Sequence, residues 1–108
     1  MNRVAITGAG TINSLGHSVK ETLASMADGS CGIGELSFRD VDRLDIKIGG
    51  QVKDFVPTTV FNRQQLSLYD RVTQFTLIAA KEAIKQSGIT FSGELSARSG
   101  VVLGTAGG

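Results

Sequence analysis

The chain has 108 residues, 41% hydrophobic and 19% charged, and its 14 glycines are accompanied by a single proline. This composition is typical of one small soluble globular domain and excludes a disordered Pro/Gly linker. Eleven basic and ten acidic residues give a net charge of +1, so no electrostatic case exists for binding nucleic acid or an anionic membrane. With no signal-peptide or transmembrane pattern and one cysteine, we expect a cytoplasmic protein.

The first segment, Arg3–Thr7 (RVAIT), is a short apolar run that predicts a buried strand. Gly8–Gly16 then forms a turn and a loop. A helix follows, with Ser18 as its N-cap, Glu21 as the capping-box partner and its end at Asp28-Gly29.

The middle of the chain contains weaker signals. Gly29–Gly34 is too glycine-rich to be anything but a loop. Apolar and polar residues alternate over Leu44–Lys53, which predicts a half-exposed strand. Phe55–Phe61 is expected to be irregular around its proline, and Asn62–Tyr69 to form a short helix.

The strongest helix signal is Asp70–Gly88, with Asp70 at its amino end and Gly88 as its stop. Apolar residues cover much more than a third of its surface, which is typical of a buried helix. Three small residues would let neighbouring layers approach closely: Ala79, Ala80 and Ala83. We therefore predict a helix between layers, with a sheet on at least one side.

After a polar connection at Ile89–Arg98, Val101–Leu103 predicts a second buried strand. The order strand, helix, irregular excursion, helix, strand indicates half of a layered α/β domain with parallel strands. We see no internal domain boundary over residues 1–108. Because domains do not normally end directly after a buried strand, we expect an amino-terminal piece of a larger protein.

Three patterns suggest chemistry, and each has a simpler explanation. VAITGAG follows a strand as a dinucleotide-binding fingerprint would. One version of that motif requires glycine at position 13 and the other requires it at positions 12 and 14, but this chain has Asn13, Ile12 and Ser14 there. Cys31 and His17 could form a nucleophile and base, yet nothing in the sequence orients them, and they are too few to bind a metal. Interleaved charges favour a solvated loop: Arg39, Asp40, Asp42, Arg43 and Asp45.

No single stretch of this sequence is specific for a family, but the order and spacing of several stretches together are. These stretches are RVAITGAG at 3–10, Leu15-Gly16, Gly29-Ser30 with Gly32-Ile33, GQVKDF at 50–55, DRVTQF at 70–75, and Gly100–Gly104. Over Arg3–Gly108 they resemble the amino-terminal part of the β-ketoacyl-acyl-carrier-protein synthases, the elongating condensing enzymes. The chain departs from this pattern at Asn13-Ser14, where many members have Ser-Pro, in the charged segment Phe38–Asp45, and in the loop Gly104–Gly108. These departures leave the subfamily open.

The resemblance implies a thiolase-like α-β-α-β-α architecture, of which this chain would be about half of one α/β repeat. It implies decarboxylative Claisen condensation of malonyl-acyl-carrier protein with an enzyme-bound acyl group, in fatty-acid or polyketide synthesis. The partners would be acyl carrier protein, acyl and malonyl thioesters, and a second subunit in a homodimer or heterodimer. No cofactor or metal is expected. The nucleophilic cysteine and two histidines would lie beyond Gly108, so neither Cys31 nor His17 receives a catalytic role.

Two alternatives remain open: a non-catalytic partner subunit of the chain-length-factor type, and an NAD-binding Rossmann-type domain. The one candidate substrate-binding residue is Gly107, which by resemblance would border the acyl pocket, where some members carry a bulky aliphatic residue. Ala106 could occupy the same place, and the glycines could serve only a tight turn.

Overall fold

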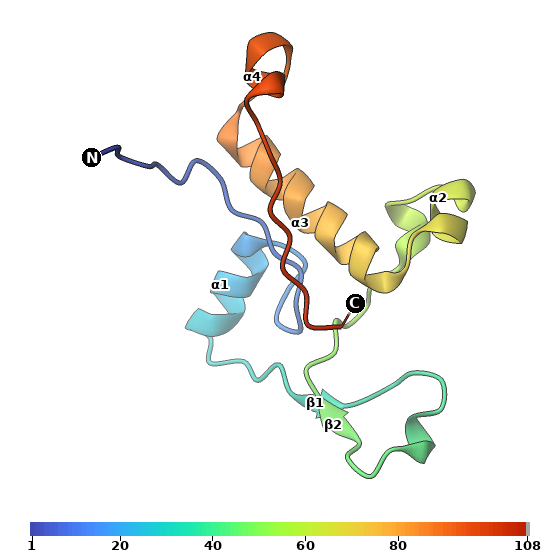
Figure 1. Ribbon diagram of the computed structural model, residues 1–108. Helices are drawn as coiled ribbons and strands as arrows, with labels where there is room; N and C mark the ends of the chain where they lie inside the picture. The colour runs from blue at the N-terminus through green and yellow to red at the C-terminus, as the bar shows by residue number, and fades with distance from the viewer. Residues whose placement is uncertain (108) are drawn as a thin grey trace.

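A computed structural model describes residues 1–107. Within this range the elements are α1 (Val19–Ala27), β1 (Gly34–Glu35), β2 (Ile48–Gly49), α2 (Arg63–Leu68), α3 (Arg71–Ser87) and α4 (Gly93–Ala97), with 3-10 helices at Val41–Arg43 and Pro57–Thr59 (Figure 1). No helix in this range is long and apolar enough to cross a membrane.

The three predicted helices are confirmed, and their caps explain their bounds. The Asp70 carboxylate accepts a hydrogen bond from the Thr73 N–H at 2.8 Å, and Gly88 ends α3 with a φ of 66°. The Ser18 hydroxyl accepts from the Glu21 N–H at 3.1 Å and begins α1. A side-chain oxygen thus satisfies one of the free N–H groups at the start of both α1 and α3.

The capping box of α1 differs in detail from the prediction, and α2 has one that was not predicted. The Glu21 carboxylate accepts from the N–H of His17, at 2.7 Å, rather than from that of Ser18. In α2 the box is complete: Asn62 accepts from the Gln65 N–H, and the Gln65 side chain accepts from the Asn62 N–H.

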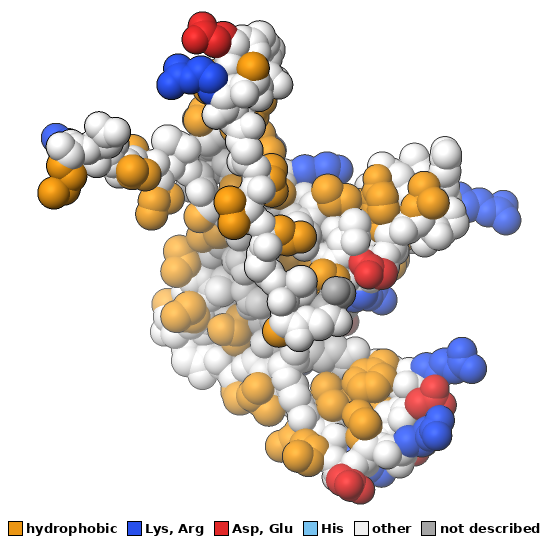
Figure 2. Space-filling model, viewed as in Figure 1, with side chains coloured by type: hydrophobic (Ala, Val, Ile, Leu, Met, Phe, Trp, Pro, Cys, Tyr) orange, Lys and Arg blue, Asp and Glu red, His pale blue; other side chains and the backbone are white. Residues whose placement is uncertain are grey.

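The region where α2 meets α3 contains the most buried residues of the described chain, Phe61 and Gln74. The Phe61 ring meets that of Tyr69 edge to face, with centroids 5.9 Å apart. The Gln74 amide donates to the Tyr69 carbonyl at 2.9 Å and so holds the corner between the two helices. Many of the other large hydrophobic side chains are exposed, and Figure 2 shows hydrophobic side chains over much of the visible face.

The predicted connection Ile89–Arg98 was wrong in part, because it contains the helix α4 at Gly93–Ala97. The predicted strand Leu44–Lys53 was too long. Within it, only Ile48–Gly49 forms a strand, which pairs with Gly34–Glu35. Gly34 is the last residue of the predicted loop Gly29–Gly34, and Glu35 follows it. This pair is antiparallel, with Gly34 opposite Gly49, so the expected parallel pairing is absent from the described residues.

The two predicted buried strands are also wrong for this chain. Arg3–Thr7 and Val101–Leu103 are drawn-out, unpaired segments whose side chains lie in solvent: Val4 is 92% exposed and Val102 is 101% exposed (Figure 1). A strand forms only where a neighbouring strand satisfies its N–H and C=O groups, and no described residue supplies one.

The helix α3 was expected to be buried nearly all round, and this too was wrong for the described chain. Gln74 is its one buried residue, whereas Val72, Ala80 and Ile84 are exposed. One covered face is that of Ala79 and Ala83, against which the glycine-rich turn packs, and nearer the amino end Phe75 packs on Phe55. The described residues thus cover parts of α3 without enclosing it between two layers.

Candidate functional site

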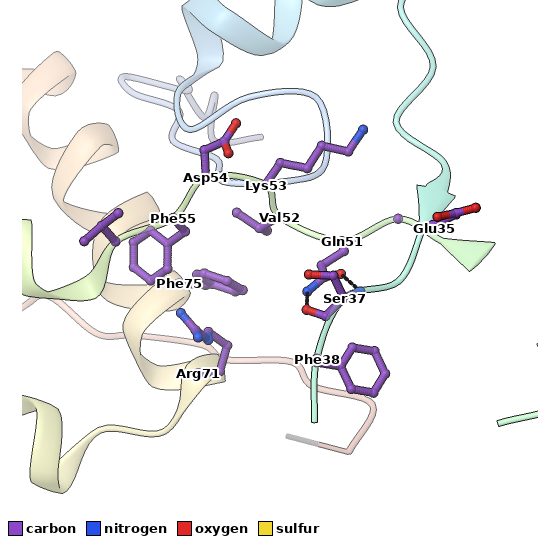
Figure 3. Close-up of a pocket in the computed structure, with 12 residues that line it drawn as sticks. Glu35, Ser37, Phe38, Gln51, Val52, Lys53, Asp54, Phe55, Arg71 and Phe75 are labelled. Atoms are coloured by element: carbon purple, nitrogen blue, oxygen red, sulfur yellow. Dashed lines mark hydrogen bonds between the residues drawn. The ribbon is translucent and has the colours of Figure 1, made fainter. Parts of the chain in front are cut away.

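A cleft of about 840 Å³ opens beside the amino end of α3 (Figure 3). One wall is formed by Arg71 and Phe75 of α3, a second by the segment 50–56, and a third by the residues that follow β1, including Ser37 and Phe38. Aromatic and aliphatic side chains make up much of this lining, which also includes charged groups of both signs: Lys53, Arg71, Glu35 and Asp54.

Arg71 is held in this cleft by aromatic rings. Its guanidinium carbon lies 5.2 Å from the ring centroid of Phe55 and 5.7 Å from that of Phe75, and the two rings meet edge to face. These are distances at which a cation is attracted to an aromatic face. Among residues 1–107, no carboxylate forms an ion pair with Arg71, which lines the cleft.

The opposite wall is fixed by the side chain of Gln51. Its amide oxygen accepts from the Ser37 N–H at 2.8 Å, and its amide nitrogen donates to the Ser37 carbonyl at 2.9 Å (Figure 3). This pair of bonds mimics a rung of a β-ladder and joins the two segments beyond the end of the short sheet.

Neither cysteine nor histidine lines this cleft. The arrangement offers apolar walls and one guanidinium to a group that has an apolar body and an anionic end, beside two carboxylates that would repel such a group.

The structure does not bring Cys31 and His17 together. His17 Nε2 lies 2.6 Å from the carbonyl oxygen of Lys53, and because a carbonyl can only accept, Nε2 donates there. The exposed Cys31 thiol contacts the carbonyl of Ile33 at 3.7 Å. In the part of the chain that the structure describes, no three potential ligands gather as a metal site.

The interleaved charges at residues 39–45 lie where the sequence indicated, on an exposed loop around the 3-10 helix Val41–Arg43. One ion pair forms within it, between Arg39 and Asp40 at 3.6 Å. Since both side chains lie mostly in solvent, this pair contributes little to stability.

The turn that resembled a dinucleotide fingerprint packs against α3 instead. A Cβ atom on Gly8 would overlap the carbonyl oxygen of Ala83, and one on Gly10 would overlap that of Ala79. The two glycines therefore serve a close approach between backbones. The small alanines of α3 predicted a close approach by a neighbouring layer, and the segment that approaches Ala79 and Ala83 is this turn.

The comparisons decide the family. Residues 1–108 match the family described as beta-ketoacyl synthase, N-terminal domain, so the match covers the whole chain. The chain belongs to the β-ketoacyl synthase family.

Two relatives of this synthase domain bear the same name, 3-oxoacyl-[acyl-carrier-protein] synthase 2. The protein of Staphylococcus aureus strain N315 is 29% identical over 103 residues, which are 95% of this chain and 25% of the relative. The protein of Synechocystis sp. is 32% identical over 104 residues, with the same coverage. The chain thus spans about a quarter of the length of the curated relatives it matches.

Within this synthase domain, Gly107 lies in the exposed tail that follows Val101–Leu103. Its φ is 156°, a value that side-chain-bearing residues rarely adopt, and no described atom lies within 4 Å of the place a Cβ would take. It does not line the cleft beside Arg71. The cleft residues were missed by sequence reasoning, although the motifs GQVKDF and DRVTQF that supply most of them were noted.

Proposed function

We propose that the polypeptide carrying this chain is a β-ketoacyl-acyl-carrier-protein synthase, which condenses malonyl-acyl-carrier protein with an enzyme-bound acyl group and releases carbon dioxide. The family match over the whole chain carries this proposal, and the shared name of the two relatives supports it. The partners would be acyl carrier protein and acyl thioesters, in a cytoplasmic homodimer with thiolase-like layers.

The catalytic cysteine and histidines would then be supplied by residues outside this chain. The natural polypeptide should form β-ketoacyl-acyl-carrier protein from malonyl- and acyl-carrier protein, whereas residues 1–108 alone should neither condense nor decarboxylate. Turnover by residues 1–108 above the buffer rate would contradict the assignment. Decarboxylation without condensation by the natural polypeptide would instead indicate the non-catalytic partner type.

A finer proposal concerns Gly107, which would border the acyl pocket and leave room for long or bulky acyl chains. Its lack of a side chain and its unusual φ support a place where the backbone itself forms the wall. In the natural polypeptide, Gly107→Ile should shorten the longest acyl chain accepted and leave short primers unaffected. Each methylene excluded is worth about 1 kcal/mol, or several-fold in kcat/KM per carbon.

The control is Gly107→Ala, which forces the same φ on a residue with a Cβ but adds little volume. If alanine alters the chain-length profile as much as isoleucine does, backbone strain rather than bulk is responsible. An unchanged profile in both variants would leave the glycine with only its role in the turn.

A further inference from the structure

One carboxylate in the described chain binds two backbone segments at once. Glu82, on α3, accepts from the Thr11 N–H with Oε2 at 2.9 Å and from the Val19 N–H with Oε1 at 2.8 Å. Thr11 begins the loop before α1 and Val19 is the first residue of α1, so the two donors bracket the loop. Both bonds are partly buried.

Val19 N–H is one of the groups that an α-helix leaves without an internal partner. Such groups carry the positive end of the helix dipole and favour negative charge. Two other donors near the start of α1 have local acceptors, since Ser18 binds the Glu21 N–H and Glu21 binds the His17 N–H. The place beside Val19 is taken by a residue 63 positions away.

We propose that Thr11 and Val19 form a backbone anion site, and that Glu82 is its internal ligand. A glycine-rich turn followed by a helix N-terminus is the arrangement that holds phosphate in nucleotide-binding folds. Here the same arrangement is filled by a carboxylate of the chain itself. This gives a physical reason why a turn resembling a dinucleotide fingerprint need not bind a dinucleotide.

The consequence is a positioning role for Glu82. The loop that it fixes at both ends forms one wall of a second cleft, of about 480 Å³, through the residues 13–17. If the negative charge fixes the loop, neutralising Glu82 should release Thr11 and Val19. If the packing of Gly8 and Gly10 on α3 is sufficient, the loop should stay in place without it.

Two isosteric substitutions separate these possibilities in the natural polypeptide. Glu82→Gln removes the charge and turns an amide donor toward one of the two N–H groups. Glu21→Gln makes the same change on a carboxylate that binds only the nearby His17 N–H. Hydrogen exchange, resolved to single residues by fragmentation in the mass spectrometer, should be about tenfold faster at Thr11 or Val19 in Glu82→Gln, and unchanged at both in Glu21→Gln.

A second variant tests the requirement for an anion. In Glu82→Ala both amides should exchange faster, and sodium acetate should slow them again, whereas acetamide or sodium chloride at the same concentration should not. Exchange at Thr11 and Val19 within about twofold of the parent in Glu82→Gln would overturn the proposal. Equal rescue by acetamide would overturn the anion site. If Glu82→Ala does not fold, Glu82→Gln decides alone.

Discussion

Two parts of this chain, one glycine-rich and the other apolar, differ in whether they are packed on the rest of the chain. The docked segment, Gly8–Val19, is fixed on α3 by backbone packing and by hydrogen bonds that its N–H groups donate to α3 side chains, including one from the Ala9 N–H to Gln86 at 2.7 Å. The bare segments, Arg3–Thr7 and Val101–Leu103, have unpaired backbones and solvent-exposed side chains.

The difference lies in where each segment finds its partners. A turn can be satisfied by one helix that presents small residues and acceptors at helical spacing, as Ala79, Ala83, Glu82 and Gln86 do. A strand needs another strand along its whole length. The docked segment therefore depends only on residues within the chain, whereas the bare segments require a neighbour that the described residues do not supply.

The largest effect expected within residues 1–108 comes from filling the contact between the docked segment and α3. In Gly10→Ala the new Cβ would overlap a backbone oxygen of α3, which cannot move aside as a side chain can. We expect a loss of about 3 kcal/mol in the free energy of unfolding, measured by urea denaturation. The matched control is Gly100→Ala, where no atom lies within 4 Å, and it should change stability by about 0.5 kcal/mol or less. Equal midpoints for the two variants would contradict the close approach.

The next effect tests whether the open faces of α3 are covered elsewhere. Ala80 is exposed in the described chain, so Ala80→Asp should cost residues 1–108 only the lower helix propensity of aspartate, about 0.7 kcal/mol. In the natural polypeptide a second layer on α3 would bury the charge without a partner and cost about 3 kcal/mol or more.

The control for this comparison is Ala80→Asn, which has the shape of aspartate without its charge. If Ala80→Asp lowers the melting temperature of residues 1–108 and of the natural polypeptide by the same small amount, α3 is not sandwiched between layers.

A smaller effect on stability, but a clear one on association, is expected at the bare segments. Exposed apolar strand edges favour self-association, and Val101 and Val102 are almost entirely exposed. Val102→Lys should shift residues 1–108 toward the monomer in sedimentation velocity while changing the free energy of unfolding by about 0.5 kcal/mol or less. Thr90→Lys adds the same charge at another exposed position, and an equal shift there would assign the effect to net charge alone.

The sequence predicted those elements whose causes are local. The caps at Ser18, Asn62 and Asp70 each bind an N–H three residues ahead, so the bounds of three helices could be predicted from short stretches. The helix α4 was missed because its cap, Ser92, makes no side-chain hydrogen bond and its first residue is Gly93.

The cleft could not be predicted, because its walls come from segments that are distant in sequence. The bonds between Gln51 and Ser37, and the rings that hold Arg71, depend on how those segments meet. The role of Glu82 was hidden for the same reason, since the two N–H groups that it binds lie 71 and 63 positions away in the sequence. The exposure of Arg3–Thr7 could not be predicted either, because an apolar run does not show whether its pairing partner is present.

The smallest expected effect lies at the amino end of α3, outside the docked contact. Thr73 donates from its hydroxyl and its N–H to Asp70 and so holds the pKa of that carboxyl below its ordinary value. The folded state thus favours the ionised form, and this contribution to stability is present above about pH 4 and is lost as the pH falls through the lowered pKa. Because Asp70 is solvent-exposed, the contribution is small. Asparagine is also a good N-cap, so Asp70→Asn should keep α3 intact and flatten the acid limb of stability against pH, followed by circular dichroism in fixed urea. The control is Asp45→Asn, at another exposed position. If the acid limb is as steep in Asp70→Asn as in Asp45→Asn, Asp70 does not contribute to the loss of stability in acid.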